Sequence, residues 1–337
     1  MSATTADPRI DGGGRPLQRL LRAAGRAGLA AWMPYLYVAV LGGAIWALQP
    51  ALIDGPGAVD VRFSAVVPLA LVAFGQTLVM FTRGIDLAVG GVISTATALL
   101  ATRGADGATL WLLIAAVVAL GGVAGLINGV AVAVTRLQPF IVTLATWSIF
   151  GGVALLILPQ EGGASPPALS EALLGSVLGV PKAVWVVALL LALWGWLRHT
   201  RLITDLRAIG SDEQRARLIG VPIARRTIQA YVLSGLFAAL AGVWIAAQTG
   251  SGSPTAGDPF ILSSVAAVVL GGTSIFGGTG SAAASIVGAI AFLLIPDLIA
   301  ALQLESFWST FFQGALLIAA VTVSSIAAQL KRRRGAA

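Results

Sequence analysis

Long apolar runs alternate with short polar segments along most of the chain. The runs cover residues 33–49, 63–82, 87–101, 109–134, 139–158, 183–197, 227–248, 261–273, 282–301 and 309–330. A helix that crosses a bilayer needs about 20 predominantly apolar residues, because lipid offers its backbone no hydrogen-bond partners. The pattern therefore predicts an all-α fold, a polytopic transmembrane helical bundle of about ten spans.

Three of these runs, 87–101, 183–197 and 261–273, are short for a complete crossing. The first and the third are also rich in glycine at one end. Irregular backbone is tolerated at membrane depth only where protein buries it or where it lines a cavity. We therefore expect short broken or re-entrant segments among the spans.

The basic residues predict the orientation of the chain. If the N-terminus is cytoplasmic, an even number of spans returns the C-terminus to the same side. This arrangement places all 21 Lys and Arg residues on the cytoplasmic side except Arg62, Arg103 and Lys182. Because cytoplasmic loops are enriched in Lys and Arg, we predict that both termini are cytoplasmic.

The same pattern divides the chain into three parts. Residues 1–28 carry Arg, Gly and Asp without apolar periodicity, and are predicted to be a disordered basic cytoplasmic tail. Residues 29–330 are predicted to form the transmembrane domain, with a charged cytoplasmic loop at 198–226. Residues 331–337 are predicted to form a second basic cytoplasmic tail.

The composition agrees with a membrane protein and excludes several kinds of chemistry. Charged residues make up 10% of the chain, whereas a soluble domain carries about 25%. Cysteine is absent, which excludes disulfides, thiolate zinc sites and a cysteine nucleophile. The net charge of +7 is distributed between and beside the apolar runs, so we expect no nucleic-acid partner.

Residues that could drive transport or catalysis are sparse. The two lysines, Lys182 and Lys331, lie outside any phosphate-binding G-x-x-x-x-G-K-[ST] loop, so this chain is not expected to bind ATP. Asp86 and Asp297 are the only ionisable residues near the interior of a predicted helix, and they form no evident proton relay. We therefore predict no cofactor, no metal site and no enzymatic activity, and expect the energy to come from another subunit.

The loop at 198–226 is the longest charged stretch between two spans. Ser211 is expected to cap a helix that runs through Gln214 to Leu218, with Asp212 and Glu213 in its first turn. This helix either lies on lipid headgroups or docks in the groove of a partner protein. Its apolar face and mixed charges favour docking.

Four stretches, in order along the chain, resemble motifs of one protein family. They are TRGIDLAVGG at 82–91, LQPFIVTLAT at 137–146, the loop at 207–221, and AAVVLGGTS at 266–274, followed by further glycines. Together they resemble permeases of ATP-binding-cassette importers of the ribose, xylose and galactofuranose type. Ala88 stands where that family usually has serine, and Gln138 stands where it often has a small residue.

The resemblance implies the partners and the location of the chain. It implies a bacterial inner-membrane permease that pairs with a second copy or a paralogue. Cassette ATPase subunits would bind ATP and Mg on the cytoplasmic side, and a periplasmic or lipid-anchored solute-binding protein would deliver a sugar-like solute.

The resemblance also implies two sets of functional residues. The set that couples to the ATPase comprises Arg207, Gly210, Ser211, Asp212, Glu213, Arg215, Ala216, Arg217, Leu218, Gly220 and Val221. The signature set comprises Arg83, Ile85, Asp86, Leu87, Gly90, Gly271, Gly272, Thr273, Gly277 and Gly278, whose glycines are expected to form a tight turn and close helix contacts.

Candidate residues for the solute pathway are mostly polar side chains of the predicted spans. They are Gln76, Thr77, Asn128, Gln138, Phe140, Thr143, Thr146, Ser148 and Phe150. Asn128 lies in a run with Gly121, Gly125 and Gly129, whose small-x-x-x-small spacing favours helix packing. Asn128 is expected either to bond across helices or to face the pathway.

The leading hypothesis is a permease subunit for a monosaccharide or a similar small polar solute. One alternative is a permease of the same superfamily for branched-chain amino acids, nucleosides or a furanose signal. A carrier or channel that works alone is the third possibility, but it predicts intramembrane charges or a pore-lining ring, and neither is evident in the sequence.

Overall fold

The protein is mostly helical in the part that the computed structural model describes, residues 32–50, 58–104, 107–135, 137–319 and 322. Its elements are α2 (Met33–Leu48), α4 (Ala58–Phe81), α5 (Ala88–Thr102), α6 (Ala108–Thr135), α7 (Pro139–Ile157), α8 (Pro167–Leu173), β1 (Ser176–Val177), β2 (Val180–Pro181), α9 (Lys182–Leu197), α10 (Arg201–Ser211), α11 (Glu213–Leu218), α12 (Ile223–Thr249), α13 (Asp258–Leu270) and α14 (Ala282–Ala301). A further apolar helix covers Phe307–Ala319. The two predicted tails, 1–28 and 331–337, lie outside the described residues.

Each predicted apolar run coincides with an apolar helix as far as the described residues reach; most of the last run after residue 319 lies outside them. Five helices, α4, α6, α7, α12 and α14, are long and apolar enough to cross a membrane. The bent pair α9 and α10, whose axes differ by 76°, meets the same test when taken together. The remaining apolar helices, α2, α5, α13 and Phe307–Ala319, are shorter. The prediction of an all-α bundle of apolar helices is confirmed.

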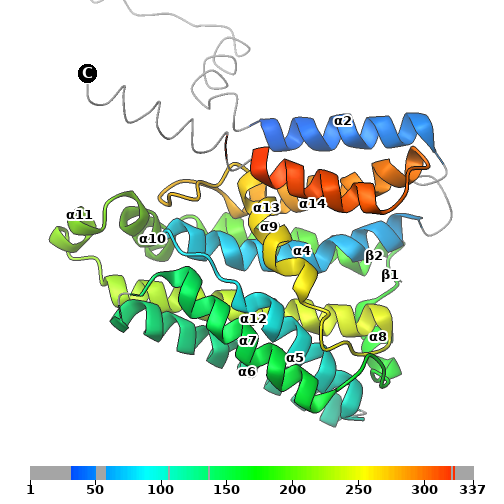
Figure 1. Ribbon diagram of the computed structural model, residues 1–337, viewed down its shortest axis with the longest axis horizontal. Coiled ribbons are helices and arrows are strands. Elements are labelled where there is room, and N and C mark those ends of the chain that lie inside the picture. The colour runs from blue at the N-terminus through cyan, green and yellow to red at the C-terminus, as the bar shows by residue number, and fades with distance from the viewer. Residues whose placement is uncertain (1–31, 51–57, 105–106, 136, 320–321, 323–337) are drawn as a thin grey trace, which may run out of the picture.

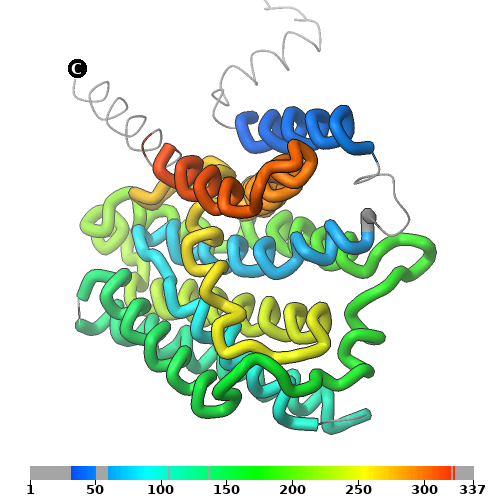
Figure 2. Tube along the Cα trace, turned by 45° about the vertical axis from the view of Figure 1, so that its right-hand side comes forward, coloured from blue at the N-terminus to red at the C-terminus, as the bar shows by residue number. Residues whose placement is uncertain are grey.

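The helices form layers with α4 in the middle. In Figures 1 and 2, α2 and α14 lie on one side of α4, and α12, α6 and α7 lie on the other. Most of α4 and α12 is buried, whereas α6 and α7 expose most of their surface. An aromatic group of Phe74, Trp194 and Phe237 joins α4, α9 and α12 in the core.

Glycines on α6 allow its backbone to approach that of α12. A Cβ atom added to Gly121 or Gly125 would collide with the carbonyl oxygen of Gly235 or Tyr231, and one at Gly129 would also meet the α12 backbone. Close approach of this kind is how small-x-x-x-small motifs join helices in lipid. The prediction that these glycines serve packing is confirmed.

The short helix α13 follows a partly buried, non-helical stretch at 250–257. This stretch runs beside α5, where the Thr97 hydroxyl donates to the Ser253 carbonyl at 2.9 Å. The Gly257 amide donates to the Ser94 hydroxyl at 3.0 Å. The irregular backbone thus finds its hydrogen-bond partners on α5, as burial away from water requires.

The short helix α5 likewise follows a non-helical stretch, at 82–87. The side-chain amide of Gln76 bonds to both backbone groups of Asp86. Its nitrogen donates to the Asp86 carbonyl at 3.1 Å, and its oxygen accepts from the Asp86 backbone N–H at 3.2 Å. The Thr143 hydroxyl donates to the Ile85 carbonyl at 3.0 Å. A long helix, a non-helical stretch and a short helix therefore occur twice, and the two short helices are those of the runs 87–101 and 261–273.

We expect Gly125→Val to destabilise the bundle by about 1–3 kcal/mol, because the new side chain pushes α6 away from α12. Thermal unfolding of the detergent-solubilised protein measures the effect. The matched control is Gly43→Val on α2, where an added Cβ meets nothing within 4 Å. Equal unfolding midpoints for the two variants would contradict the packing described for α6.

Candidate coupling site

Three segments that are far apart in the sequence meet at one end of the molecule. They are the end of α4 with Arg83, the helix α10, and the glycine-rich loop 271–281. The Gly278 amide donates to the Phe81 carbonyl at 3.0 Å, which joins the loop to α4. In Figure 1 this end is on the left, where α10 and α11 project from the helical body. Three of the four stretches that resemble family motifs thus contact one another at this end.

Arg83 joins the end of α4 to the end of α10. Its backbone has φ 67°, in the left-handed region that non-glycine residues rarely adopt. Its Nε donates to the Gly210 carbonyl at 2.7 Å, and its Nη2 donates to the Ser211 carbonyl at 2.8 Å. The last carbonyls of a helix lack partners within that helix and carry partial negative charge. A guanidinium therefore suits this position.

Arg207 points from α10 into the body of the protein. Its Nη2 donates to the Gly280 carbonyl at 2.6 Å, and its guanidinium lies 5.1 Å from the ring centre of Phe81 and 5.8 Å from that of Trp194. Burial lowers the pKa of the Arg207 guanidinium. The group stays charged, because arginine does not lose its proton in proteins. Arg207 therefore holds α10 against α4, α9 and the loop.

Gly210 allows the closest contact of the site. A Cβ atom at this position would collide with the Phe81 carbonyl oxygen and would lie 2.5 Å from the Gly278 amide nitrogen. Gly277 and Gly278 have φ values of 80° and 77°, which favour glycine. The contact between helix and loop thus needs glycine on both sides.

The coupling loop contains two helices, where the sequence predicted one. Asp212 ends α10 and caps α11, accepting from the Arg215 amide at 3.0 Å. The prediction that Ser211 caps this helix is wrong, because Ser211 is the last residue of α10 and its hydroxyl donates to the Arg207 carbonyl at 2.8 Å. The chain changes direction at Asp212, and α11 projects outward.

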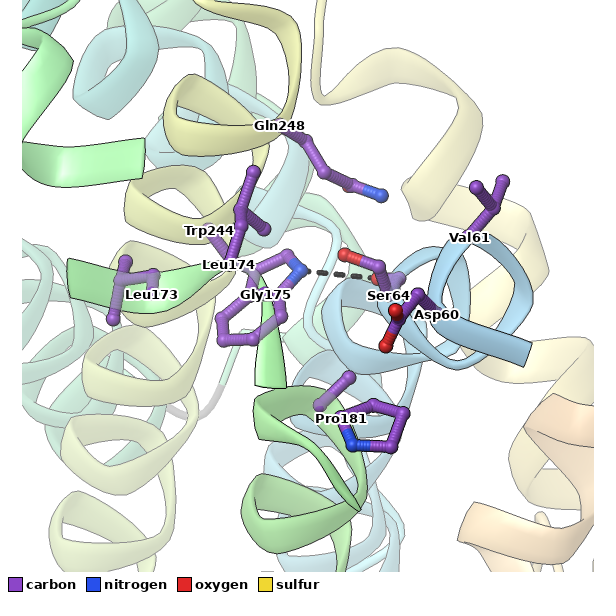
Figure 3. A pocket seen from close by; sticks show the side chains of 10 residues that line it. Asp60, Val61, Ser64, Leu173, Leu174, Gly175, Pro181, Trp244 and Gln248 are labelled. Atoms are coloured by element: carbon purple, nitrogen blue, oxygen red, sulfur yellow. Dashed lines mark hydrogen bonds between the residues drawn. The ribbon is translucent and has the colours of Figure 1, made fainter. Parts of the chain in front are cut away.

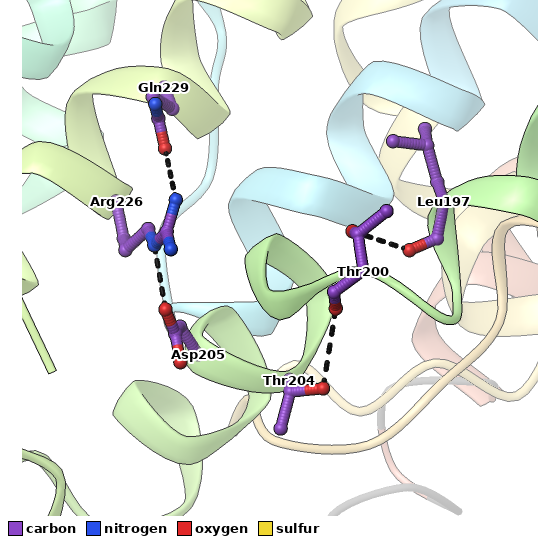
Figure 4. A network of polar contacts seen from close by, with 6 residues as sticks. All are labelled: Leu197, Thr200, Thr204, Asp205, Arg226 and Gln229. Carbon is purple, nitrogen blue, oxygen red and sulfur yellow. Dashed lines mark hydrogen bonds and ion pairs between the residues drawn. The ribbon is translucent and has the colours of Figure 1, made fainter. Parts of the chain in front are cut away.

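An ion pair fixes α10 to α12. Arg226 Nε lies 2.7 Å from Asp205 Oδ2, and Arg226 Nη1 donates to the Gln229 side chain at 2.9 Å (Figure 4). Both charged side chains are largely buried. Sequence reasoning missed this pair, since its members are 21 residues apart and each resembles an ordinary loop charge.

The tip of the projection exposes two apolar side chains. Leu218 is 86% exposed and Ile219 is 75% exposed, whereas Ala216 is buried. Gly220, with φ 80°, turns the chain after them. The Val221 amide donates to the Ala216 carbonyl at 3.0 Å. A rigid base with an exposed apolar tip is the arrangement expected of a surface that binds a partner protein.

The exposed charges of α11 pair with one another. Arg215 Nε lies 3.0 Å from Asp212 Oδ2, and Arg217 Nη2 lies 3.2 Å from Glu213 Oε1. Exposed ion pairs of this kind stabilise a fold by about 0–1 kcal/mol. These side chains are free to exchange their partners when another protein docks.

Several predicted pathway residues lie in contacts between helices. The Thr77 hydroxyl donates to the Ser285 hydroxyl at 2.8 Å, and Ser285 also lies 3.4 Å from the Thr273 hydroxyl. The Thr146 hydroxyl donates to Asn128 Oδ1 at 2.6 Å. Asn128 thus bonds across helices, and its Nδ2 has no partner among the described residues.

The other pathway candidates lie nearer the surface of the single chain. Gln138, Phe140 and Ser148 are exposed, and Phe150 is half-buried. All four belong to α7 or its N-cap. Whether these residues line the pathway stays a prediction.

The remaining signature glycines allow other backbone contacts. A Cβ at Gly90 would crowd Ile261 on α13, and one at Gly271 would crowd Ala284 and Ser285 on α14. Gly272 has φ 80°, which turns the chain after α13. Leu87 precedes α5 and is buried.

Known proteins resemble this chain over most of its length. The family model described as branched-chain amino acid transport system / permease component matches residues 62–321. The chain is 35% identical over 262 residues to the ribose import permease protein RbsC of Escherichia coli (strain K12), covering 76% of this chain and 82% of the relative.

Two further relatives have a similar sequence identity to this chain. The chain is 32% identical to the ribose import permease protein RbsC of Bacillus subtilis (strain 168), over 74% of this chain and 79% of the relative. It is 33% identical to the autoinducer 2 import system permease protein LsrC of Escherichia coli (strain K12 / DH10B), over 76% of each chain. No solved structure matches the chain.

We expect Gly210→Ala to open the contact between α10 and the loop 271–281. The collision with Phe81 breaks the hydrogen bond of the Gly278 amide, so that amide exchanges with solvent about tenfold faster or more. Hydrogen exchange of the peptide containing Gly278 measures this. The control is Gly195→Ala on α9, where an added Cβ meets nothing. Unchanged exchange in Gly210→Ala would contradict the geometry.

Proposed function

This chain belongs to the family of transport-system permease components that its residues 62–321 match, and we propose that it is the permease of an ATP-binding-cassette importer in the bacterial inner membrane. It forms the pathway for a monosaccharide or a similar small polar solute. The observation that carries this proposal is the projection of α10 and α11. It has an exposed apolar tip, and partly buried hydrogen bonds join its base to Arg83 and to the loop 271–281.

The choice of a sugar-like solute has two supports. Two of the relatives above are named as ribose import permeases, and a third as an import permease for autoinducer 2. The TRGIDL stretch at 82–87 resembles the signature of the sugar-type branch. The family description mentions branched-chain amino acids, so such an amino acid is the alternative solute that transport assays must include.

The proposed energy source is a separate cassette ATPase that binds ATP and Mg. The tip formed by Leu218 and Ile219 enters an apolar groove of this ATPase, and the charges of α11 surround it. Buried apolar anchors with a polar rim are the usual arrangement of such interfaces. A solute-binding protein delivers the solute at the opposite end, and a second permease copy or a paralogue completes the pathway.

The same contacts suggest how ATPase closure reaches the spans. Arg83, Arg207 and Asp205 hold α10 to α4, α9, α12 and the loop 271–281. A helix held by several charge-assisted hydrogen bonds moves with its neighbours as a rigid body. Motion of α10 therefore moves the non-helical stretch 82–87 before α5 and the loop between α13 and α14.

We expect replacement of Leu218 and Ile219 together by Asp to weaken ATPase binding about 30-fold or more, as loss of an apolar anchor does. Co-purification of the permease with its cassette ATPase measures this. The matched control is Leu178→Asp, because Leu178 is 90% exposed on the hairpin at the other end of the molecule.

Two results would contradict this role of the tip. One is retention of the ATPase by the double variant at wild-type levels. The other is equal loss of the ATPase in Leu178→Asp. Solute transport by the purified chain without any ATPase would instead support a carrier that works alone.

We expect Arg83→Ala and Arg207→Ala to separate docking from coupling. Both side chains bond to backbone carbonyls of the permease itself and not to the ATPase. The ATPase therefore still binds, but less solute is moved for each ATP hydrolysed. Transport and hydrolysis measured in the same proteoliposomes give this ratio. Arg215→Ala is the control, because its exposed ion pair contributes little. A wild-type ratio of transport to hydrolysis in both Arg83→Ala and Arg207→Ala would contradict the proposed transmission.

A further inference from the structure

A small cavity lies at the end of the molecule opposite the coupling site. Its volume is about 290 Å³, and it lies between the first turns of α4, the last turns of α12 and the segment from α8 to the start of α9 (Figure 3). Asp60 and Ser64 line it from α4, whose 24 residues place them about 30 Å from Arg83. The volume equals that of about ten water molecules, so only a small ligand fits.

Two polar atoms of this cavity are buried without a hydrogen-bond partner among the described residues. They are Asp60 Oδ1 and Ser64 Oγ. A buried oxygen without a partner costs about 1–3 kcal/mol, so native proteins usually satisfy such atoms with water or a ligand. Gln248, which is exposed at the end of α12, adds an amide group on the facing wall.

The rest of the lining is apolar and fixed in place. The indole nitrogen of Trp244 donates to the Ser64 carbonyl at 3.0 Å, which orients the ring beside the cavity. Leu174 and Pro181 complete the apolar wall. An aromatic ring next to hydroxyl, amide and carboxylate groups provides both an apolar face and hydrogen-bond partners, which are the two surfaces of a sugar.

The charge of the site narrows the ligand further. A carboxylate repels anions, and its free oxygen accepts a hydrogen bond from a hydroxyl group. We propose that this cavity binds one small, neutral, polyhydroxylated molecule of monosaccharide size, whose hydroxyls bond to Asp60, Ser64 and Gln248 while its C–H face packs on Trp244. The proposed function guides the choice of sugar as the probe, whereas the site itself rests on the cavity.

The chain has no cysteine, which allows a direct test in the full-length protein. Val61 lies at the rim of the cavity and is 71% exposed, so Val61→Cys is the reporter for a hydrophilic maleimide. In nanodiscs, D-ribose at twice its Kd should slow labelling about threefold, by simple occupancy. Val177→Cys on the adjacent hairpin, which is 47% exposed and outside the lining, should label at the same rate with and without ribose.

Second variants on the Val61→Cys background identify the groups responsible. Asp60→Asn and Ser64→Ala keep the shape of the side chains approximately, and each should reduce ribose protection. L-lysine hydrochloride at the same concentration tests whether the carboxylate instead binds a cation. Protection by ribose that either variant weakens supports the site.

Three outcomes overturn the proposal. They are labelling of Val61→Cys that no monosaccharide slows, protection by lysine as strong as that by ribose, and ribose protection that persists in both variants. Co-purification of the same Val61→Cys protein with its ATPase is measured in parallel. If ribose gives no protection but the ATPase still binds, only the proposed ribose site is wrong and the proposed function stands. If the Val61→Cys protein and the wild-type protein bind no ATPase, the proposed function itself is contradicted.

Discussion

The close contact between Gly210, Phe81 and Gly278 is the constraint on which the end of the molecule that carries α10 and α11 depends. Backbone atoms make this contact, which joins the end of α10, the end of α4 and the loop 271–281. Any side chain at Gly210 would separate them. Arg83 and Arg207 then bond to carbonyls that this contact brings within reach. The arginines thus strengthen an arrangement that glycine makes possible.

A related constraint applies to the broken helices in the middle of the bundle. Backbone without regular hydrogen bonds is costly in lipid, so each non-helical stretch before α5 and α13 must find its partners on neighbouring helices. Gln76, Ser94, Thr97 and Thr143 provide them. Polar side chains in apolar helices therefore have a structural task here, even where their chemistry also suits a solute pathway.

Much of the fold could be predicted from the sequence, because the length of each apolar run indicates where a helix begins and ends. The short apolar runs predicted that α5 and α13 are short helices, whereas the non-helical stretches that precede them lie outside the glycines of those runs. The cap of α11 was assigned to the wrong residue, since Ser211 and Asp212 are both good caps and the residue at which α10 ends decides between them. The Ser211 hydroxyl bonds back to the Arg207 carbonyl, which leaves Asp212 to cap.

Contacts between distant segments were beyond prediction, because nothing in one sequence shows that Gly210 meets Gly278 or that Asp205 meets Arg226. If α10 transmits ATPase closure as proposed, α10, α11 and the loop 271–281 move as one body. Spin labels at Arg215→Cys and Phe276→Cys, both exposed, test it in the complex with the ATPase. The distance between the labels should then be the same with and without bound ATP. A distance that changes during the ATPase cycle would contradict it.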